Sequence, residues 1–443
     1  MAEDEAEPEE PGQAAEPEEA AELDQPERPD EPDEPDQPEG RGRAAVRRWG
    51  GRRVMRLGAL TLSGLVLLVA AVGTVIFLRL NGNIRDLPLF GGIGGDAGKE
   101  QPDAFGRTPV NVLVIGSDTR ADPADCHLGG ACGPGENADV EMVLHISADR
   151  THATALSIPR DTVTELPACR KPHGGVSPAT RGQVNSTLRF GPGCTVAAVH
   201  ALTRIPIDHF VMADFAGVVR MSDAVGGVPV CVDRDVYDSY SHLKLARGRH
   251  ALKGTAALQF LRSRHGFGDG SDIGRTDAQH LFLAALALRM RQSGSLTDPA
   301  SLLDVADAAT RALTVDPGLA SVSKLVGLAK DLRKVPSARL SFTTAPTRPD
   351  PGDPNRVVVT ETGQRLFAAI AADMPLTVTG APAGDDKPAD PTNAPATHTR
   401  GRTAATGSGC AKVATTRSVR VRGVAMTPSA AFRATPRIPV SAR

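Results

Sequence analysis

Residues 110–120 read V-N-V-L-V-I-G-S-D-T-R, a nearly continuous apolar run that opens into a polar loop. The apolar part, 110–116, is typical of a strand buried on both faces of a sheet. A second strand is expected over 139–147, where apolar residues recur with period two and share one face: Val140, Met142, Leu144 and Ile146. After a turn at 148–152, the run A-T-A-L-S-I-P predicts a third strand that Pro159 ends.

The chain that follows alternates between helical and extended patterns. Helices are expected over 194–203, 253–261, 302–313, 322–332 and 361–372, and strands over 208–214 and 228–232. A further helix is expected after its cap Asp214, and a long one from Ser271 to Gln292. Alternating strands and helices indicate an α/β/α sandwich. The hairpin-like order of the first strands indicates a mixed central sheet.

Along the N-terminal part of the chain, the net charge changes from negative to positive. Residues 1–40 are rich in Glu, Asp and Pro and have too little apolar surface to offset the entropy of ordering, so a disordered acidic tail is expected. Residues 41–56 form a basic juxtamembrane segment, and the uncharged run at 57–78 predicts a transmembrane helix over 57–80. A cleaved signal peptide is the alternative, but the run starts late and lacks a small-residue cleavage site.

The positive-inside rule places the basic segment and the acidic tail in the cytoplasm. We therefore expect a single-pass protein of the cell membrane whose main domain is extracytoplasmic. Residues 81–106 are Gly-rich and predict a linker, and 107–376 hold the domain. Residues 377–443 predict a disordered C-terminal tail, which from 401 onward is basic without any acidic residue.

Cysteine usage agrees with that location, because disulfides persist outside the cytosol. All cysteines follow the apolar run, at positions 126, 132, 169, 194, 231 and 410. Cys126 with Cys132, and Cys169 with Cys194, are candidate pairs, although spacing does not decide connectivity. The absence of a C-x-x-C pair argues against a structural zinc site of the cysteine type.

Two carboxylates stand at neighbouring strand ends. Asp118 follows the first strand and Asp139 begins the second, so both side chains can converge at one edge of the sheet. Carboxylates together with substrate phosphates are the usual way of holding Mg²⁺. The alternative is that Asp118 makes an Asx-turn and Asp139 is an ordinary strand-end residue.

Four arginines stand at the ends of expected elements: Arg160, Arg262, Arg264 and Arg275. The guanidinium group is an always-charged fork that suits phosphate oxygens, and Arg275 lies in a helical first turn that also favours anions. Together these residues predict a pyrophosphate site, with surface charge as the alternative. A phosphate-binding P-loop motif is absent from the sequence, and no hydrolytic triad is recognisable. His265 and His280 are candidate proton shuttles, with a solvated or capping role as the alternative.

From Val110 to Ala372 the chain resembles the LytR-CpsA-Psr family of bacterial cell-envelope proteins. The resemblance rests on V-L-V-I-G-S-D-T-R, A-D-V-E-M-V-L-H-I, L-S-I-P-R-D-T, D-A-V-G-G-V-P-V-C-V, L-K-G-T-A-A-L-Q-F-L-R-S-R-H and S-D-I-G-R, in this order behind a single apolar span. It implies an α/β sandwich with a groove for a lipid tail. It also implies a phosphotransferase that moves a glycopolymer from a polyprenyl-pyrophosphate carrier to peptidoglycan through a phosphodiester bond. The low Lys content and the Arg- and Ala-rich composition look actinobacterial.

The resemblance also implies residue roles. Asp118 and Asp139 correspond to Mg²⁺ ligands, and Asp139 is also a candidate for helping to activate the acceptor. The implied pyrophosphate contacts are Arg120, Arg160, Arg262, Arg264, Arg275 and Gln279. The implied catalytic residues are Asp139, Arg160, Arg262, Arg264 and Arg275. Phosphoryl transfer needs positioning and charge neutralisation above all, and this set can supply both.

The sequence departs from the family pattern at two positions, where Asn137 and Ala278 stand in place of the usual arginines. Three consequences of these departures remain alternatives. The enzyme is weaker, it prefers a less charged donor, or Arg120 and Lys171 supply the missing phosphate contacts. Two other functions remain alternatives: a lipid-pyrophosphate hydrolase and a non-catalytic envelope receptor or regulator. Nucleic acid is not an expected partner, because the acidic tail would repel phosphate.

Overall fold

The computed structural model describes residues 50–119, 125, 126, 128, 137–172, 174–270, 272–292, 299–379, 398–406 and 409–442. The chain divides into two compact units, residues 1–66 and 67–443. The acidic segment 1–40 and Arg120 lie outside the described residues. Helix α1 spans Gly50–Asn83, and its part Met55–Asn83 is long and apolar enough to cross a membrane.

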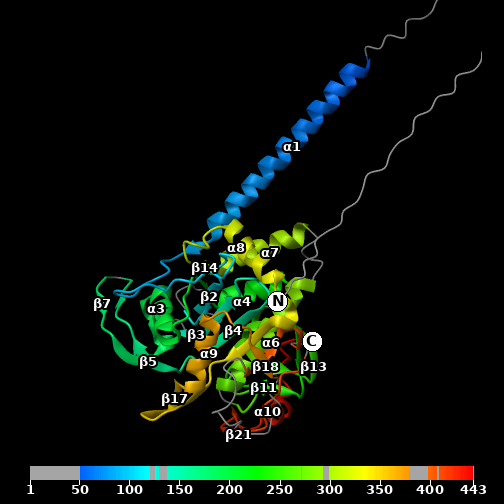
Figure 1. Ribbon diagram of the computed structural model, residues 1–443. Helices are drawn as coiled ribbons and strands as arrows, with labels where there is room; N and C mark the ends of the chain where they lie inside the picture. Colours follow the sequence, from blue (N-terminus) through cyan, green and yellow to red (C-terminus); the bar gives the residue numbers. More distant parts are fainter. Residues whose placement is uncertain are drawn as a thin grey trace, which may run out of the picture. The chain divides into compact units, whose positions relative to one another are not determined.

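The α/β domain lies within residues 67–443, and the order of its elements alternates as expected (Figure 1). Its helices are α3 (Pro192–Thr203), α4 (Phe215–Ala224), α5 (Gly254–Arg262), α6 (Asp272–Gln292), α7 (Pro299–Ala312), α8 (Val322–Lys334), α9 (Glu361–Ala371) and α10 (Pro428–Ala434). Short 3₁₀ turns are η1 (Val184–Phe190), η3 (Ser337–Arg339) and η4 (Ala404–Thr406).

A mixed sheet forms the centre of the domain, in the order β1-β14-β9-β2-β3-β4-β15-β19-β18. Its strands are β1 (Arg85–Asp86), β14 (Leu313–Val315), β9 (His209–Ala213), β2 (Val110–Ser117), β3 (Ala138–Ile146), β4 (Ala153–Ile158), β15 (Leu340–Thr344), β19 (His398–Thr403) and β18 (Thr377–Thr379). β3 runs antiparallel to its neighbours β2 and β4, whereas β9 pairs with β2, and β15 with β4, in parallel. The predicted mixed sheet is confirmed.

Smaller antiparallel pairs surround the sheet. They are β5 (Val163–Leu166) with β8 (Thr180–Gln183), β6 (Cys169–Arg170) with β7 (Val176–Ser177), β10 (Val228–Val232) with β13 (Gly248–Leu252), β11 (Val236–Asp238) with β12 (Leu243–Leu245), β16 (Thr347–Asp350) with β17 (Asp353–Val359), and β20 (Val419–Val421) with β21 (Val424–Met426).

Apolar alternation along β3 divides the core between the two faces of the sheet. The face that carries Val143 packs against α3 and α9. The opposite face, with Met142 and Ile146, packs against α6 and α8. The period-two face expected from the sequence is therefore the α6/α8 face, and helices cover both sides as in the predicted α/β/α sandwich. Asp214 caps α4 by accepting the Gly217 N–H over 2.7 Å, also as predicted.

The prediction of a linker over 81–106 is wrong, because this segment packs onto the domain. β1 pairs with β14, and Leu89 and Phe90 pack against the core beside α3. The Gly91 N–H donates to Gly193 O over 2.9 Å. Apolar side chains within the Gly-rich run supply this packing, which composition alone conceals.

The prediction that 377–443 is a disordered tail is also wrong for its described residues. β19 adds to the sheet beside β15, and β20, β21 and α10 follow. Disulfides join Cys231 to Cys410 and Cys169 to Cys194, the second of which was a candidate pair. The C-terminal part of the chain has few apolar residues of its own. It is ordered by a cross-link and by a sheet edge contributed from far upstream.

Candidate active site

The start of β3 and the end of β4 form the centre of the candidate site. The last pair of their antiparallel register is Glu141 with Ile158, and Asp139 and Arg160 lie just beyond it. Arg160 Nη1 donates to Asp139 Oδ1 over 2.6 Å, and Arg160 Nε lies 3.6 Å from Asp161 Oδ2. Strand register therefore brings two of the predicted site residues together.

Arg264 joins the same carboxylate from another part of the chain. Its Nη2 lies 3.5 Å from Asp139 Oδ1. The Arg264 side chain is 39% exposed, compared with 17% for Arg160. Asp139 thus lies between a half-buried and an open guanidinium group, and Arg264 is the one more accessible to a ligand.

Asp238 at the end of β11 holds the segment that carries Arg264, a role not predicted from the sequence. Its buried carboxylate accepts from Ser263 Oγ over 2.8 Å and from the His265 N–H over 3.2 Å. The residues on either side of Arg264 are therefore fixed to one oxygen. The aspartate is 25 positions before Ser263 and carries no motif, so no sequence signal was available to identify it.

Arg262 ends α5 and lies against another helix. Its guanidinium carbon is 4.6 Å from the ring centre of Phe215, the first residue of α4, an arrangement in which the ring attracts the cation. Its Nη1 also donates to Leu128 O over 3.1 Å. Arg262 is thus partly engaged in holding α4 and α5 together.

Arg275 and Gln279 lie one turn apart on α6, as predicted. Both are buried, with exposures of 3% and 6%. Gln279 Nε2 donates to Leu261 O over 3.1 Å. This contact fixes the end of α5 just before Arg262, so Gln279 ties α6 to the segment that carries the other arginines.

Asp118 is connected to the start of β3 through Asn137. The Asp118 N–H donates to Asn137 O over 3.1 Å, and the Asn137 N–H donates to Asp118 Oδ1 over 2.7 Å. Among the described residues, the Oδ2 atoms of Asp118 and Asp139 accept no hydrogen bond. Two carboxylates on adjacent strand ends, each with one oxygen already oriented, are a donor set that fits Mg²⁺.

Glu141 lies beneath this network, two residues along β3 from Asp139. Burial raises the pKa of its carboxyl group well above the usual range. Within the described part of the chain, neither of its oxygens has a hydrogen-bond partner. Burial therefore favours the neutral form of this carboxyl group beside the arginines.

The two departures from the family pattern lie in different surroundings. Asn137 contributes its backbone to the Asp118 contacts. Ala278 is 2% exposed and packs in the apolar cluster with Leu281 and Phe282, so an arginine there would have to displace core side chains. Lys171, the suggested substitute, lies in the exposed turn between β6 and β7.

The histidines considered as proton shuttles both have local structural partners. His265 Nδ1 lies 3.2 Å from Gly270 O, and its ring packs 4.4 Å from that of Tyr240. His280 is buried in α6, with its Nε2 hydrogen-bonded to Ser157 Oγ over 2.7 Å. Burial, with a smaller effect of the Arg402 cation, lowers the pKa of His280 to about 3. His280 is thus a neutral core residue.

His280→Gln is expected to reduce the acid sensitivity of the fold. As the pH falls below the ordinary histidine pKa of 6.5, the unfolded chain takes up a proton at this residue and the folded chain does not. The folded state then loses about 1.4 kcal/mol per pH unit down to the folded-state pKa. Between pH 7 and pH 5, urea unfolding should show the wild type losing about 2 kcal/mol more than the variant. His250→Gln on β13 is the control and should follow the wild type; equal losses in all three proteins would contradict the assignment.

The chain is similar in sequence to a family of known proteins. The LytR_cpsA_psr family model matches residues 96–370. The "Cell wall biosynthesis protein LcpA" of Corynebacterium glutamicum is 30% identical over 322 residues, covering 67% of this chain and 60% of that protein. The "Polyisoprenyl-teichoic acid–peptidoglycan teichoic acid transferase TagU" of Halalkalibacterium halodurans is 29% identical over 288 residues, covering 62% and 87%.

A solved structure, "LytR-Csp2A-Psr enzyme from Actinomyces oris", is 23% identical, covers 65% of this chain and 95% of its own, and has a TM-score of 0.49. The chain spans 60% of the length of LcpA and 49% of that of "Probable cell wall biosynthesis protein LcpB" from the same Corynebacterium. The family match covers more than half of the sequence and includes Asp118, Asp139 and the arginines around them. The chain belongs to the LytR_cpsA_psr family.

Proposed function

We propose that the protein transfers a glycopolymer from a polyprenyl-pyrophosphate carrier to peptidoglycan and forms a phosphodiester bond. The observation that carries this function is the Asp139 carboxylate held between the guanidinium groups of Arg160 and Arg264. The names of LcpA and TagU support cell-wall biosynthesis and transfer of a polymer to peptidoglycan. The polyprenyl-pyrophosphate carrier and the sequence of bond changes are inferred from the chemistry of the site.

The arginines supply the charge that a diphosphate needs. Arg264 is more open than Arg160, so it is assigned to the phosphoryl group that changes partner, and Arg160 keeps Asp139 in place. Arg262 follows Leu261, whose carbonyl oxygen Gln279 contacts, and Arg275 lies one turn before Gln279 on α6. Fixed cations of this kind stabilise charge on equatorial oxygens in phosphoryl transfer. Gln279 is assigned a positioning role through Leu261.

The proposed reaction is a nucleophilic displacement at phosphorus. The acceptor hydroxyl oxygen bonds to the phosphorus next to the glycan, and the bond from that phosphorus to the bridging oxygen breaks. Polyprenyl phosphate leaves with the bridging oxygen and its electron pair. Asp139 orients the hydroxyl group and takes its proton, which then passes to solvent.

Asp118 and Asp139 are the residues that would hold Mg²⁺. When bound, the ion would neutralise charge on the pyrophosphate oxygens. Without the ion, Asp118 has a structural role, because its hydrogen bonds with Asn137 fix the end of β2 against the start of β3.

The proposed location is the outer face of the cell membrane, with α1 as a single-pass anchor. Seven arginines within residues 41–56 precede the apolar span, which favours a cytoplasmic N-terminus. The disulfides Cys169–Cys194 and Cys231–Cys410 fit an oxidising compartment for the domain.

The test uses the full chain in detergent with a polyprenyl-pyrophosphoryl glycan, Mg²⁺ and peptidoglycan fragments. Glycan attached to wall fragments supports transfer. Accumulation of free phosphate-terminated glycan would instead identify a hydrolase. Binding of the donor without turnover would identify a receptor.

Arg264→Ala is expected to lower kcat/KM for this transfer by about 10²-fold, because a fixed cation at the reacting phosphate is lost. Little core packing is removed, so the melting temperature should stay near that of the wild type. Arg249→Ala, which removes an exposed arginine from β13, is the matched control and should keep full activity. An unfolded Arg264→Ala protein would show that this arginine is structural.

A further inference from the structure

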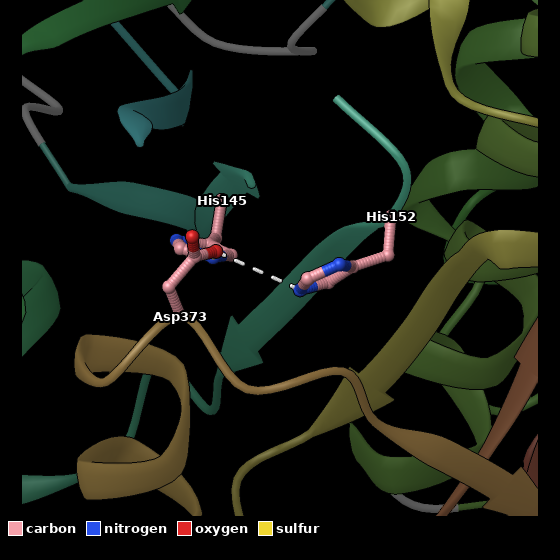
Figure 2. Close-up of side chains that lie close together, drawn as sticks. All are labelled: His145, His152 and Asp373. Atoms are coloured by element: carbon pink, nitrogen blue, oxygen red, sulfur yellow. Dashed lines mark hydrogen bonds and ion pairs between the residues drawn. The ribbon is translucent and has the colours of Figure 1, made fainter. Parts of the chain in front are cut away.

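A second group of polar side chains lies at the other end of β3. His145 projects from this strand, His152 precedes β4, and Asp373 follows α9, and the three side chains point toward one another (Figure 2). His145 Nε2 lies 3.0 Å, and His152 Nε2 3.6 Å, from the same oxygen, Asp373 Oδ1. One ligand atom from each residue falls within 4.8 Å of the others.

Asn111 defines which nitrogen of His145 carries a hydrogen. The two residues are cross-strand partners in the β2–β3 register, and His145 Nδ1 lies 2.7 Å from Asn111 Oδ1. The Nδ2 of the same amide faces Glu100 Oε1, so Asn111 Oδ1 is an acceptor and His145 Nδ1–H is the donor. In a neutral ring, the lone pair of His145 Nε2 then points at a carboxylate oxygen, and a cation is needed between them.

A proton between His145 and Asp373 does not account for the position of His152. Its Nε2 is buried, and among the described residues it has no hydrogen-bond partner. It approaches the same Asp373 oxygen as His145 does. At 3.6 Å the contact of His152 with that oxygen is too long for a hydrogen bond, whereas a metal ion between the three groups can bind both nitrogens and the oxygen together. An outer residue that fixes the ring orientation, as Asn111 does, is a regular feature of histidine metal sites.

We propose that His145, His152 and Asp373 form a zinc site. Zinc takes histidine nitrogen and carboxylate oxygen at about 2.0–2.2 Å in a tetrahedron, which puts neighbouring ligand atoms about 3.3 Å apart. The separations of 3.0 and 3.6 Å lie on either side of that value. Asp373 is 27% exposed, so the fourth position opens toward solvent.

The electrostatics of this end of the sheet favour a cation. Burial, followed by the nearby charges of Asp208 and Asp373, raises the pKa of Glu100 to about 7. Asp373 Oδ2 accepts the Ala148 N–H over 3.0 Å, and this contact leaves Oδ1 directed at the two histidine rings. Arg339 is the opposing positive charge near His152.

This site is separate from the phosphate-binding end. His145 lies six residues along β3 from Asp139, which is about 20 Å at about 3.3 Å per residue. Zinc here would tie together the end of β3, the start of β4 and the end of α9, which no disulfide joins among the described residues. Its role is therefore in stability of the fold.

The experiment titrates the full chain in detergent with Zn²⁺ in the presence of excess Mg²⁺, which occupies the carboxylates at Asp118 and Asp139. One zinc per chain is expected, and it should raise the melting temperature. Co²⁺ used as a probe should give the visible absorption of a tetrahedral ion with nitrogen ligands. Asp373→Asn and His152→Ala should each weaken zinc binding by more than about tenfold.

Asp373→Asn is the sharper variant because it preserves the local fold. Asp373 has a φ of 55°, which asparagine tolerates, and the amide oxygen can still accept the Ala148 N–H. His250→Gln and Asp353→Asn change the same residue types away from the cluster, since Asp353 pairs locally with Arg356, and both variants should bind zinc as the wild type does. Absence of zinc binding to the wild type, or equal affinity in the Asp373→Asn and His152→Ala variants, overturns the assignment. Neither result bears on polymer transfer.

Discussion

Asp139→Asn is expected to lower kcat/KM for polymer transfer by about a thousandfold and to leave the circular dichroism spectrum unchanged. Asparagine keeps the volume of the side chain and one oxygen that can accept from Arg160 Nη1, now 2.6 Å from the carboxylate. It cannot take the acceptor proton, and it is a poor ligand for a hard divalent cation. The loss should therefore fall mainly on kcat, and raising Mg²⁺ should restore only part of it.

Asp331→Asn is the matched control for this variant. Asp331 also pairs with an arginine, since Arg150 Nε lies 3.3 Å from its Oδ2, but that contact connects the β3–β4 turn to α8, at the opposite end of β3 from Asp139. Its activity should equal that of the wild type. If Asp139→Asn transfers polymer at the wild-type rate, Asp139 does not belong to the reacting centre. If it unfolds, its pairing with Arg160 and Arg264 is structural.

The part of the site on β3 and β4 was predictable because it depends on local patterns. Apolar alternation over 139–147 identified the faces of β3, and Pro159 marked where β4 ends. Once two consecutive strands pair as a hairpin, register alone brings Asp139 close to Arg160. The types of these residues then indicated phosphate chemistry, and the family resemblance gave them roles.

The contacts between distant segments were not predictable from the same patterns. Asp238 reaches Ser263 because β11 returns beside the end of α5, and nothing in the residues around 238 signals that return. His145 meets Asp373 across a sequence separation of 228. Single histidines and aspartates are common on surfaces, so only the folded chain shows which of them share a centre.

The C-terminal region was mispredicted for a compositional reason. Residues rich in Arg, Thr, Ala and Gly bury little apolar surface of their own, which is the usual signature of disorder. Here the stabilising contacts come from residues earlier in the sequence. The backbone of Phe342 on β15 lies close to Gly401, and Cys231 forms a disulfide with Cys410. Ala411 and Val413 then complete an apolar cluster that includes Phe260 and Phe267.

Ending the chain at Thr379 is therefore expected to unfold the domain or cause it to aggregate. The Cys231–Cys410 disulfide alone should contribute about 2–5 kcal/mol, and a typical domain has only about 5–15 kcal/mol in total. The truncation also removes β19 from the sheet and uncovers the cluster around Phe260. Thermal unfolding followed by circular dichroism, with gel filtration for aggregation, measures the effect.

The same truncation should abolish transfer even in protein that remains soluble, because the lost segment holds the loop after Arg264. Gly266 O accepts the Ala414 N–H over 3.0 Å, and the Gly268 N–H donates to Lys412 O over 2.8 Å. Cys231→Ser/Cys410→Ser separates the two effects: it removes the cross-link but keeps these backbone contacts, so it should lower stability and retain more activity. Deletion of residues 1–40 is the length control and should change neither property. A chain ending at Thr379 that melts like the wild type and transfers polymer would show that residues 380–443 are dispensable.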